Sequence, residues 1–511
     1  MRPLAFFLAV SVLWSWPLAL HPGSVTMSLH FDQLPAAWLV HAAPGFVPTG
    51  VNALSAWPGG EPLARLDSFL FLAIALALQG ALPGLLVTNL FVLLGPPISA
   101  WAAERFAREC LGATFPASLI AGLAFGFAPL ATVGALEGHV YYLLDPWLPL
   151  CALYAWRGEW KPAALAWTAC LLTTAYMGVN GLLVVALVWV VKRRVDARLL
   201  GAIGAVGLLY AALFAWGAAG ATSGGVSSDA LLRVGSATLT TLVAWDPWMD
   251  LNRHSLAPAL GLLPLCFALL APFVLKGWKP WLFLGLGCAI TALGPVLEVG
   301  VSRGEAWPTL LWPLHLLGVF GVYRFPIRLC WVSALVFGGL AAAVASRMRA
   351  PWVAVGLAGL DVIVFSGALF RMRPHPTPTP AVYGLLPEAA VLDLYPEIGG
   401  QQEDISFYQQ NLSCYYQLFH GRPILDRCLN TDIRSSPRVA ASREVHARLL
   451  AGEPIGDWLR TLGVGSVVVH ADLYQSSERA LVLAGLAAEL GLPAGEGHDG
   501  GEWLVAYAVG S

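Results

Sequence analysis

The sequence predicts an all-α polytopic membrane domain followed by a small C-terminal extracytoplasmic α/β domain. Hydrophobic residues make up 57% of the 511 residues and charged residues only 12%, against about 25% charged in ordinary globular chains. Charge is also uneven, because residues 371–511 carry 26 of the 60 charged side chains. The first 370 residues are therefore expected to lie in a bilayer, and the tail outside it.

Apolar stretches of roughly 17 to 25 residues are long enough to cross a bilayer, and the sequence predicts about eleven crossings on this basis. They lie at 3–20, 84–104, 113–134, 140–156, 161–175, 177–192, 198–217, 258–276, 279–297, 328–346 and 351–370. The first is interpreted as a signal anchor, with a cleaved signal peptide as the alternative. Residues 68–82 are apolar but short, and they are predicted to be interfacial or re-entrant.

The lysines and arginines predict the orientation. One set of short connections, with the adjoining helix ends and Arg2, carries 13 Lys and Arg, including all four lysines, and the opposite loops carry six. The positive-inside rule makes the first set cytoplasmic. We therefore expect a multi-pass protein of the plasma (inner) membrane, with a cytoplasmic N-terminus and an extracytoplasmic C-terminal domain.

The domain boundaries follow from composition. Residues 1–370 are the transmembrane domain, and its long outer loops are 21–67, 218–257 and 298–327. Residues 371–380 are rich in proline and predict a stiff linker. Residues 381–511 form the predicted α/β domain, with strands at 391–395 and 464–471 and helices at 443–451 and 477–491.

Two of the eight cysteines, Cys414 and Cys428, lie in the polar tail, and the other six lie in or beside apolar segments. In an oxidising compartment the two tail thiols are expected to pair. Nucleic acid is excluded as a partner, because a net charge of −2 and a pI near 6.6 offer no broad basic surface.

Asp32 is the acid of the first outer loop that is best placed for chemistry. It precedes an amphipathic run with Trp38 that is suited to lie in the membrane interface. An Asp that is shielded from water there has a raised pKa and can act as a general base. The alternative is that Asp32 caps the short helix that contains Pro35.

The junction at 135–150 places Glu137, His139 and Asp145 at an outer helix end, where ionisable groups mark a functional site by default. The alternative is that they are solvated loop residues, with Asp145 ending a helix before Pro146. Together they are candidate substrate-binding residues.

Residues 322–328 (VYRFPIR) contribute Tyr323, Arg324 and Arg328 at the start of the tenth crossing. Two guanidinium groups at headgroup level are suited to clamp a phosphate, because each offers a planar fork that stays protonated. The alternative is that the arginines contact ordinary lipid phosphates.

In loop 243–256, Trp245, Asp246 and Trp248 combine aromatic faces with a carboxylate, which suits a sugar. A plain aromatic belt at the membrane surface explains them equally well.

The layout resembles the GT-C class of polytopic membrane glycosyltransferases that use lipid-linked sugars, including bacterial mannosyltransferase-like and arabinosyltransferase-like proteins. The matching features are LHFDQ (29–33), EGHVYYLLDPWLPL (137–150), TTAYMGVNGLL (173–183), YRFPIR (323–328) and the outer α/β domain. Many relatives have Pro or Glu after the loop acid, whereas this chain has Gln33.

The resemblance implies a cell-envelope transferase with a polyprenyl-phosphate sugar as donor substrate and a glycan, lipid or protein acceptor bound by the tail. Asp32 would be the base, and the arginines would compensate the departing phosphate. Whether a divalent metal takes part is left open. Two other hypotheses for the function remain: a non-catalytic membrane scaffold that presents the C-terminal domain, and a transporter or flippase of a lipid-linked glycan.

Overall fold

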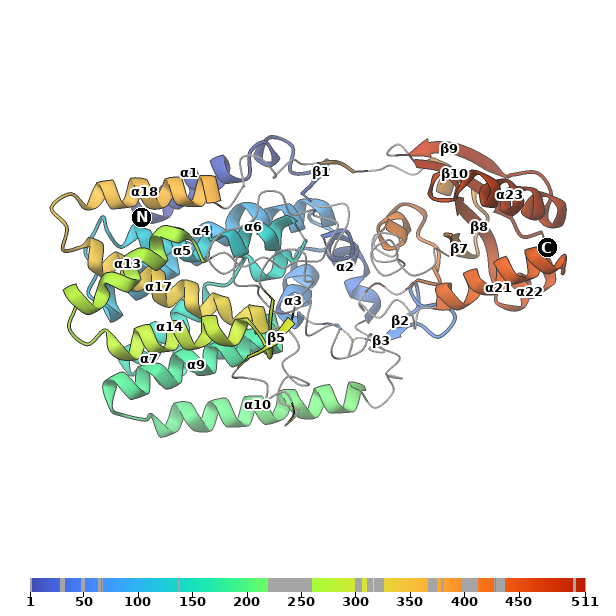
Figure 1. Cartoon of the computed structure of the whole chain (residues 1–511). Coiled ribbons are helices and arrows are strands. Elements are labelled where there is room, and N and C mark those ends of the chain that lie inside the picture. Colours follow the sequence, from blue (N-terminus) through green and yellow to red (C-terminus); the bar gives the residue numbers. More distant parts are fainter. Residues whose placement is uncertain are drawn as a thin grey trace.

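The computed structural model has a helical body at one end and a small sheet domain at the other (Figure 1). The structure describes residues 2–27, 33–46, 51–62, 66, 68–136, 138–218, 260–298, 306–309, 316, 326–365, 375–377, 381–396, 412–426, 428, 437–499 and 502–510. All structural statements below concern these residues.

A helix lies in each of the apolar stretches that the sequence analysis singled out. In chain order the helices of the body are α1 (Arg2–Trp14), α2 (Gln33–Phe46), α3 (Phe69–Leu78), α4 (Gly84–Cys110), α5 (Leu119–Gly126), α6 (Pro129–Leu136), α7 (Trp147–Arg157), α8 (Trp160–Thr173), α9 (Ala175–Lys192), α10 (Ala197–Ala218), α13 (Leu262–Val274), α14 (Lys279–Ala292), α17 (Cys330–Ala345) and α18 (Pro351–Phe365).

Four helical stretches in the described part of the chain are long and apolar enough to cross a membrane: Gly84–Cys110, Leu119–Leu136, Ala175–Lys192 and Pro326–Ala345. The number of about eleven crossings stays a prediction. Helix α3 has 10 residues and is about 15 Å long, which is half of the roughly 30 Å of a hydrocarbon core.

Helix α4 makes a close contact with another part of the body near each of its two ends. At its first residue, Gly84, a Cβ would lie 2.2 Å from the carbonyl oxygen of Ala37 in α2, so these helices touch there. Near its other end, Glu109 accepts two hydrogen bonds from the Arg157 guanidinium, at 2.8 and 2.7 Å. The 27 residues of α4 span about 40 Å. Helix α2 and the Glu109–Arg157 pair therefore lie at opposite ends of α4.

The C-terminal domain is a four-stranded mixed sheet in the order β7-β8-β10-β9. Strands β7 (Ala390–Leu394) and β8 (Val464–His470) are parallel, and β10 (Glu502–Ala508) runs antiparallel to β8 and to β9 (Gly495–Asp499). The helices are α21 (Pro437–Ala451), α22 (Gly456–Thr461) and α23 (Ser476–Leu490). Both predicted strands and both predicted helices are confirmed, whereas β9, β10 and α22 were not predicted.

The two faces of this sheet bury different partners, as the alternation of side chains along a strand requires. Val467 and Val469 pack in one hydrophobic cluster with residues of α21 to α23. Val468 points the other way and belongs to the large cluster that also contains the core of the helical body. The sheet domain and the helical body therefore share a hydrophobic core.

Residues of the segment 51–62, which follows α2, bridge the body and the sheet domain. The backbone N–H of Ile424 donates to the Leu54 carbonyl at 2.9 Å, and the Trp57 N–H donates to the Ile424 carbonyl at 3.0 Å. Ile424 also forms a parallel bridge with Val391 of β7. The loop thereby continues the hydrogen bonding of the sheet beyond its β7 edge.

A strand pair links the tail to the body, and a disulfide links two parts of the tail. Strand β6 (His375–Pro376), from the Pro-rich segment, pairs with β1 (Val25–Thr26), which lies between α1 and α2. Cys414 and Cys428 form a disulfide with their Cα atoms 5.7 Å apart, which confirms the expected pairing.

Candidate functional site

Arg328 lies over the rings of two tyrosines that come from different parts of the chain. It is in the 3-10 helix η4 (Pro326–Leu329), directly before α17. Its guanidinium carbon is 4.8 Å from the ring centre of Tyr142 and 4.3 Å from that of Tyr176. Arg328 is only 9% exposed, and a cation over an aromatic face is held more strongly when little water competes. These three residues form the centre of the candidate site.

Helix α4 fixes the position of Tyr142. This residue ends the 3-10 helix η3 (Val140–Tyr142). The next residue, Leu143, accepts a hydrogen bond from Ser99 Oγ at 3.0 Å. A Cβ at Gly95 of α4 would lie 2.8 Å from the Leu143 carbonyl carbon. Only glycine at this position lets the η3 turn pack directly on α4.

Helix α9 holds Arg328 in two ways. It begins after Thr174, whose side chain accepts a hydrogen bond from the Met177 N–H at 3.3 Å and caps the helix. Tyr176 in the first turn contacts the guanidinium, and the buried Asn180 donates to the backbone carbonyl of Arg328 at 2.9 Å. Asn180 is not among the site residues predicted from the sequence. The available signal was a polar amide within an apolar stretch.

The candidate site lies at the end of α9 away from the basic connections. At the other end of this helix the Lys192 ammonium is 3.7 Å from the ring centre of Trp156. Sixteen residues separate Tyr176 from Lys192, which is about 24 Å of helix. The site is therefore separated from the cytoplasmic face that the lysines predict.

Two candidates from the 135–150 junction are described, and their environments differ. His139 is half-buried, and its ring centre lies 6.0 Å from that of Tyr142, next to the Arg328 cluster. Asp145 is fully buried, and its N–H donates to Ser99 Oγ at 2.9 Å. Neither oxygen of its buried carboxylate has a hydrogen-bond partner among the described residues. Substrate binding by Asp145 stays a prediction.

The remaining candidates fall outside the described residues: Asp32, Glu137, Trp245, Asp246, Trp248, Tyr323 and Arg324. Gln33, directly after Asp32, is described. Its amide oxygen accepts hydrogen bonds from the Thr26 hydroxyl at 2.7 Å and the Met27 N–H at 2.9 Å, and its Nε2 donates to Asn89 of α4 at 2.7 Å. Gln33 therefore anchors the start of α2 to α4, which is a task for an amide and not for an acid.

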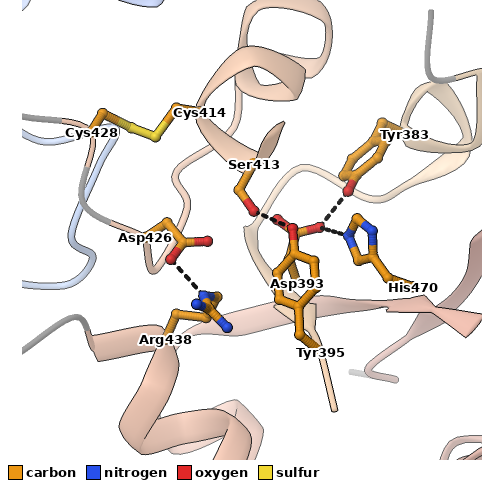
Figure 2. A network of polar contacts seen from close by, with 9 residues as sticks. All are labelled: Tyr383, Asp393, Tyr395, Ser413, Cys414, Asp426, Cys428, Arg438 and His470. Atoms are coloured by element: carbon orange, nitrogen blue, oxygen red, sulfur yellow. Dashed lines mark hydrogen bonds and ion pairs between the residues drawn. A yellow bond between two sulfur atoms is a disulfide. The ribbon is translucent and has the colours of Figure 1, made fainter. Parts of the chain in front are cut away.

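The sheet domain contains a second polar cluster, around Asp393 (Figure 2). Tyr383 donates its hydroxyl to Asp393 Oδ1, and His470 Nε2 lies 3.3 Å from the same oxygen. Burial raises the pKa of Asp393, but the contacts with His470 and Tyr383 outweigh it and leave this pKa below its usual value. The Asp393 and His470 residues are at most 1% exposed. Because a substrate has no access to them, we interpret this cluster as the polar core between the sheet and residues 412–420.

Metal binding has no candidate in the described ranges. No group of three or more His, Cys, Asp or Glu side chains there is arranged to hold a metal ion.

No protein-family model and no curated protein matches the chain. Among solved structures, the arabinofuranosyltransferase AftD from Mycobacteria is 19% identical, with a TM-score of 0.52 over 100% of this chain and 41% of AftD. The fold is that of the GT-C membrane glycosyltransferases. This chain thus spans about two fifths of the length of AftD.

Two further structures show weaker likeness. A second AftD structure is 18% identical, covers 100% of this chain and 42% of that chain, and has a TM-score of 0.49. The archaeal oligosaccharyltransferase AglB from Archaeoglobus fulgidus, in complex with an inhibitory peptide and a dolichol-phosphate, is 12% identical. It covers 95% of this chain and 71% of AglB, with a TM-score of 0.39.

Proposed function

We propose that this chain is a membrane glycosyltransferase that moves a sugar from a polyprenyl-phosphate donor to an acceptor on the extracytoplasmic face. The observation that carries the proposal is the position of Arg328 over Tyr142 and Tyr176. An arginine with little exposure, held by ring faces and by Asn180, is ready to accept a phosphate with little reorganisation. The GT-C fold supports the same activity class.

The proposed reaction is an inverting transfer. Asp32 takes the proton of the acceptor hydroxyl, and the oxygen attacks the anomeric carbon as its bond to the lipid phosphate breaks. The departing phosphate carries the negative charge to Arg328 and Arg324, with His139 nearby. A positioned general base contributes about 10²- to 10⁴-fold to such a rate. Binding of the lipid in the membrane adds to the rate by making donor and acceptor effectively intramolecular.

The outer loops and the tail provide the rest of the proposed site. Trp245, Asp246 and Trp248 would contact the sugar, and Glu137 and Tyr323 would line the same region. The C-terminal domain would bind a glycan, lipid or protein acceptor. Membrane lipids surround the body in this proposal.

The test is transfer of radiolabelled sugar from extracted lipid carriers by the purified protein. We expect Asp32→Asn to lower transfer at least about 100-fold with little change in thermal stability, because asparagine keeps the shape and the capping ability of aspartate. Arg328→Lys keeps the charge but loses the fork, so it should weaken use of the donor more than use of the acceptor. Near wild-type transfer by Asp32→Asn would make Asp32 a helix cap and favour the scaffold reading.

A further inference from the structure

Tyr142 and Tyr176 contact Arg328 through their ring faces. Tyr142 is 4% exposed and Tyr176 is half-buried, and they reach the guanidinium from η3 and from α9. A ring face attracts a guanidinium through its positive charge, whereas the N–H groups that bind anions lie at the edge of the guanidinium. The two rings therefore limit the positions that the Arg328 guanidinium can adopt.

The backbone beneath Arg328 is also fixed. Asn180, fully buried, donates to the Arg328 carbonyl, and the following residues enter α17 without a break. An arginine side chain loses rotamer freedom when it is immobilised. In this fold that entropy is lost before any ligand arrives, which raises the affinity for an anion placed at the edge.

We propose that Tyr142 and Tyr176 are positioning residues of a lipid-phosphate site, and that they act through Arg328 and not by contact with the phosphate. This inference rests on the proposed function, because it takes the phosphate of the donor as the ligand of Arg328. In this proposal the ring faces position Arg328, and the tyrosine hydroxyls do not.

The structure provides a matched control at the opposite end of the body. There the Arg157 guanidinium carbon lies over the Tyr154 ring, 5.9 Å from its centre, while Arg157 is bound to Glu109. Tyr154→Leu removes a tyrosine–arginine contact of the same chemistry that does not involve Arg328.

The experiment measures binding of decaprenyl phosphate to the full-length protein in lipid nanodiscs, together with KM and kcat for the labelled donor. We expect Tyr142→Phe and Tyr176→Phe to bind within about twofold of wild type, since the ring face remains. Tyr142→Leu and Tyr176→Leu should each weaken binding and raise the donor KM about tenfold, with a smaller change in kcat. Tyr154→Leu should bind as wild type does.

A double-mutant cycle with Arg328→Gln shows whether the two rings act on phosphate binding through Arg328. If the rings act through Arg328, the leucine substitutions have no further effect once the guanidinium is gone. An undiminished effect in that background would mean that the rings touch the lipid themselves, and equal loss in the Phe and Leu variants would assign the effect to the hydroxyls. Either result overturns the inference. Wild-type affinity in Arg328→Gln would instead overturn the proposed phosphate contact, and with it the donor assignment.

Discussion

The indole N–H of Trp38 donates to the amide oxygen of Gln417 at 2.8 Å, across 379 residues of sequence. Both side chains are fully buried. Trp38 belongs to α2 of the body, and Gln417 belongs to the helical residues 412–420 of the tail, three residues after the disulfide-bonded Cys414. The tail therefore helps to fix the helix that directly follows the proposed base.

Removal of this hydrogen bond should destabilise the junction. Trp38→Phe and Gln417→Leu each leave a buried partner group unsatisfied, which costs about 1–3 kcal/mol of unfolding free energy. The double variant should lose clearly less than the sum, because neither partner is then left alone. Denaturant unfolding of the purified protein, followed by protease release of the tail, measures this coupling.

The matched control is Tyr507→Phe, which removes the hydrogen bond from the Tyr507 hydroxyl to the Leu483 carbonyl within the sheet domain. Its effect should add to that of Gln417→Leu, since the two sites share no partner. Full additivity of Trp38→Phe and Gln417→Leu as well would contradict the coupling.

The orientation in the membrane is tested by labelling with an impermeant maleimide on intact cells. Leu492 is 90% exposed in the sheet domain, and Arg194 follows α9 at the basic end. Cys266 is exposed and is replaced by alanine, while the other free cysteines are buried. We expect Leu492→Cys to react from outside and Arg194→Cys only after permeabilisation. The reverse pattern would invert the topology.

The sequence predicted where helices and strands form better than it predicted which of them pack together. Apolar length located the helices, because the hydrocarbon core constrains only length and polarity. The pattern named the segments that contain Tyr142, Tyr176 and Arg328, but it gave no sign that they meet. Their meeting depends on how η3, η4 and the first turn of α9 pack, including the close approach at Gly95. Packing of this kind leaves no periodic signal.

The β9–β10 hairpin of the tail was not predicted from the sequence, for a related reason. Strand β9 reads GEGHD, and glycine usually argues against a strand. Here a Cβ at Gly495 would lie 2.6 Å from Leu385, and one at Gly497 would lie 3.1 Å from Val382. The glycines let the strand pack closely on residues 381–385, which a propensity argument does not anticipate.

His420 should make the stability of the sheet domain depend on pH. Its ring stacks on Tyr383 with centres 5.2 Å apart, and burial, together with the nearby Arg422 charge, lowers its pKa to about 4. The neutral form is thus favoured in the folded state, while the unfolded chain takes up a proton near pH 6.5. Stability is complete above pH 6.5 and falls as the pH drops from 6.5 towards 4.

The measurement compares unfolding free energies of wild type and His420→Phe at several values between pH 7.5 and 4. Phenylalanine keeps the stacked ring but does not titrate, so its curve should fall less over this window. Other titrating groups are present in both proteins, and the difference between the curves isolates His420. Parallel curves would show that His420 is not held neutral.

Removal of one partner of the buried Asp426–Arg438 ion pair should lower the free energy of unfolding much more than removal of both partners. Arg438 Nε lies 2.6 Å from Asp426 Oδ1, and the two side chains are 4% and 1% exposed. Arg438→Met leaves a carboxylate buried without its partner, at a cost of about 3–5 kcal/mol, and Asp426→Leu leaves a buried guanidinium at a similar cost. The double variant replaces the ion pair by two apolar side chains of similar volume, and its free energy of unfolding should lie within about 1 kcal/mol of that of wild type.

The pH dependence of Arg438→Met gives a second readout. Burial already raises the pKa of Asp426, against the opposing charge of Arg438, so loss of Arg438 raises it further. A raised carboxyl pKa means that the folded state takes up a proton before the unfolded state does, and the deficit of Arg438→Met should therefore shrink as the pH falls from 7.5 to 5. The control on the same helix is Arg448→Met, whose partner Glu444 is 43% exposed at the side chain, and it should cost less than about 1 kcal/mol. A double variant as unstable as either single one would show that the pair stabilises the fold and does not merely compensate its own burial.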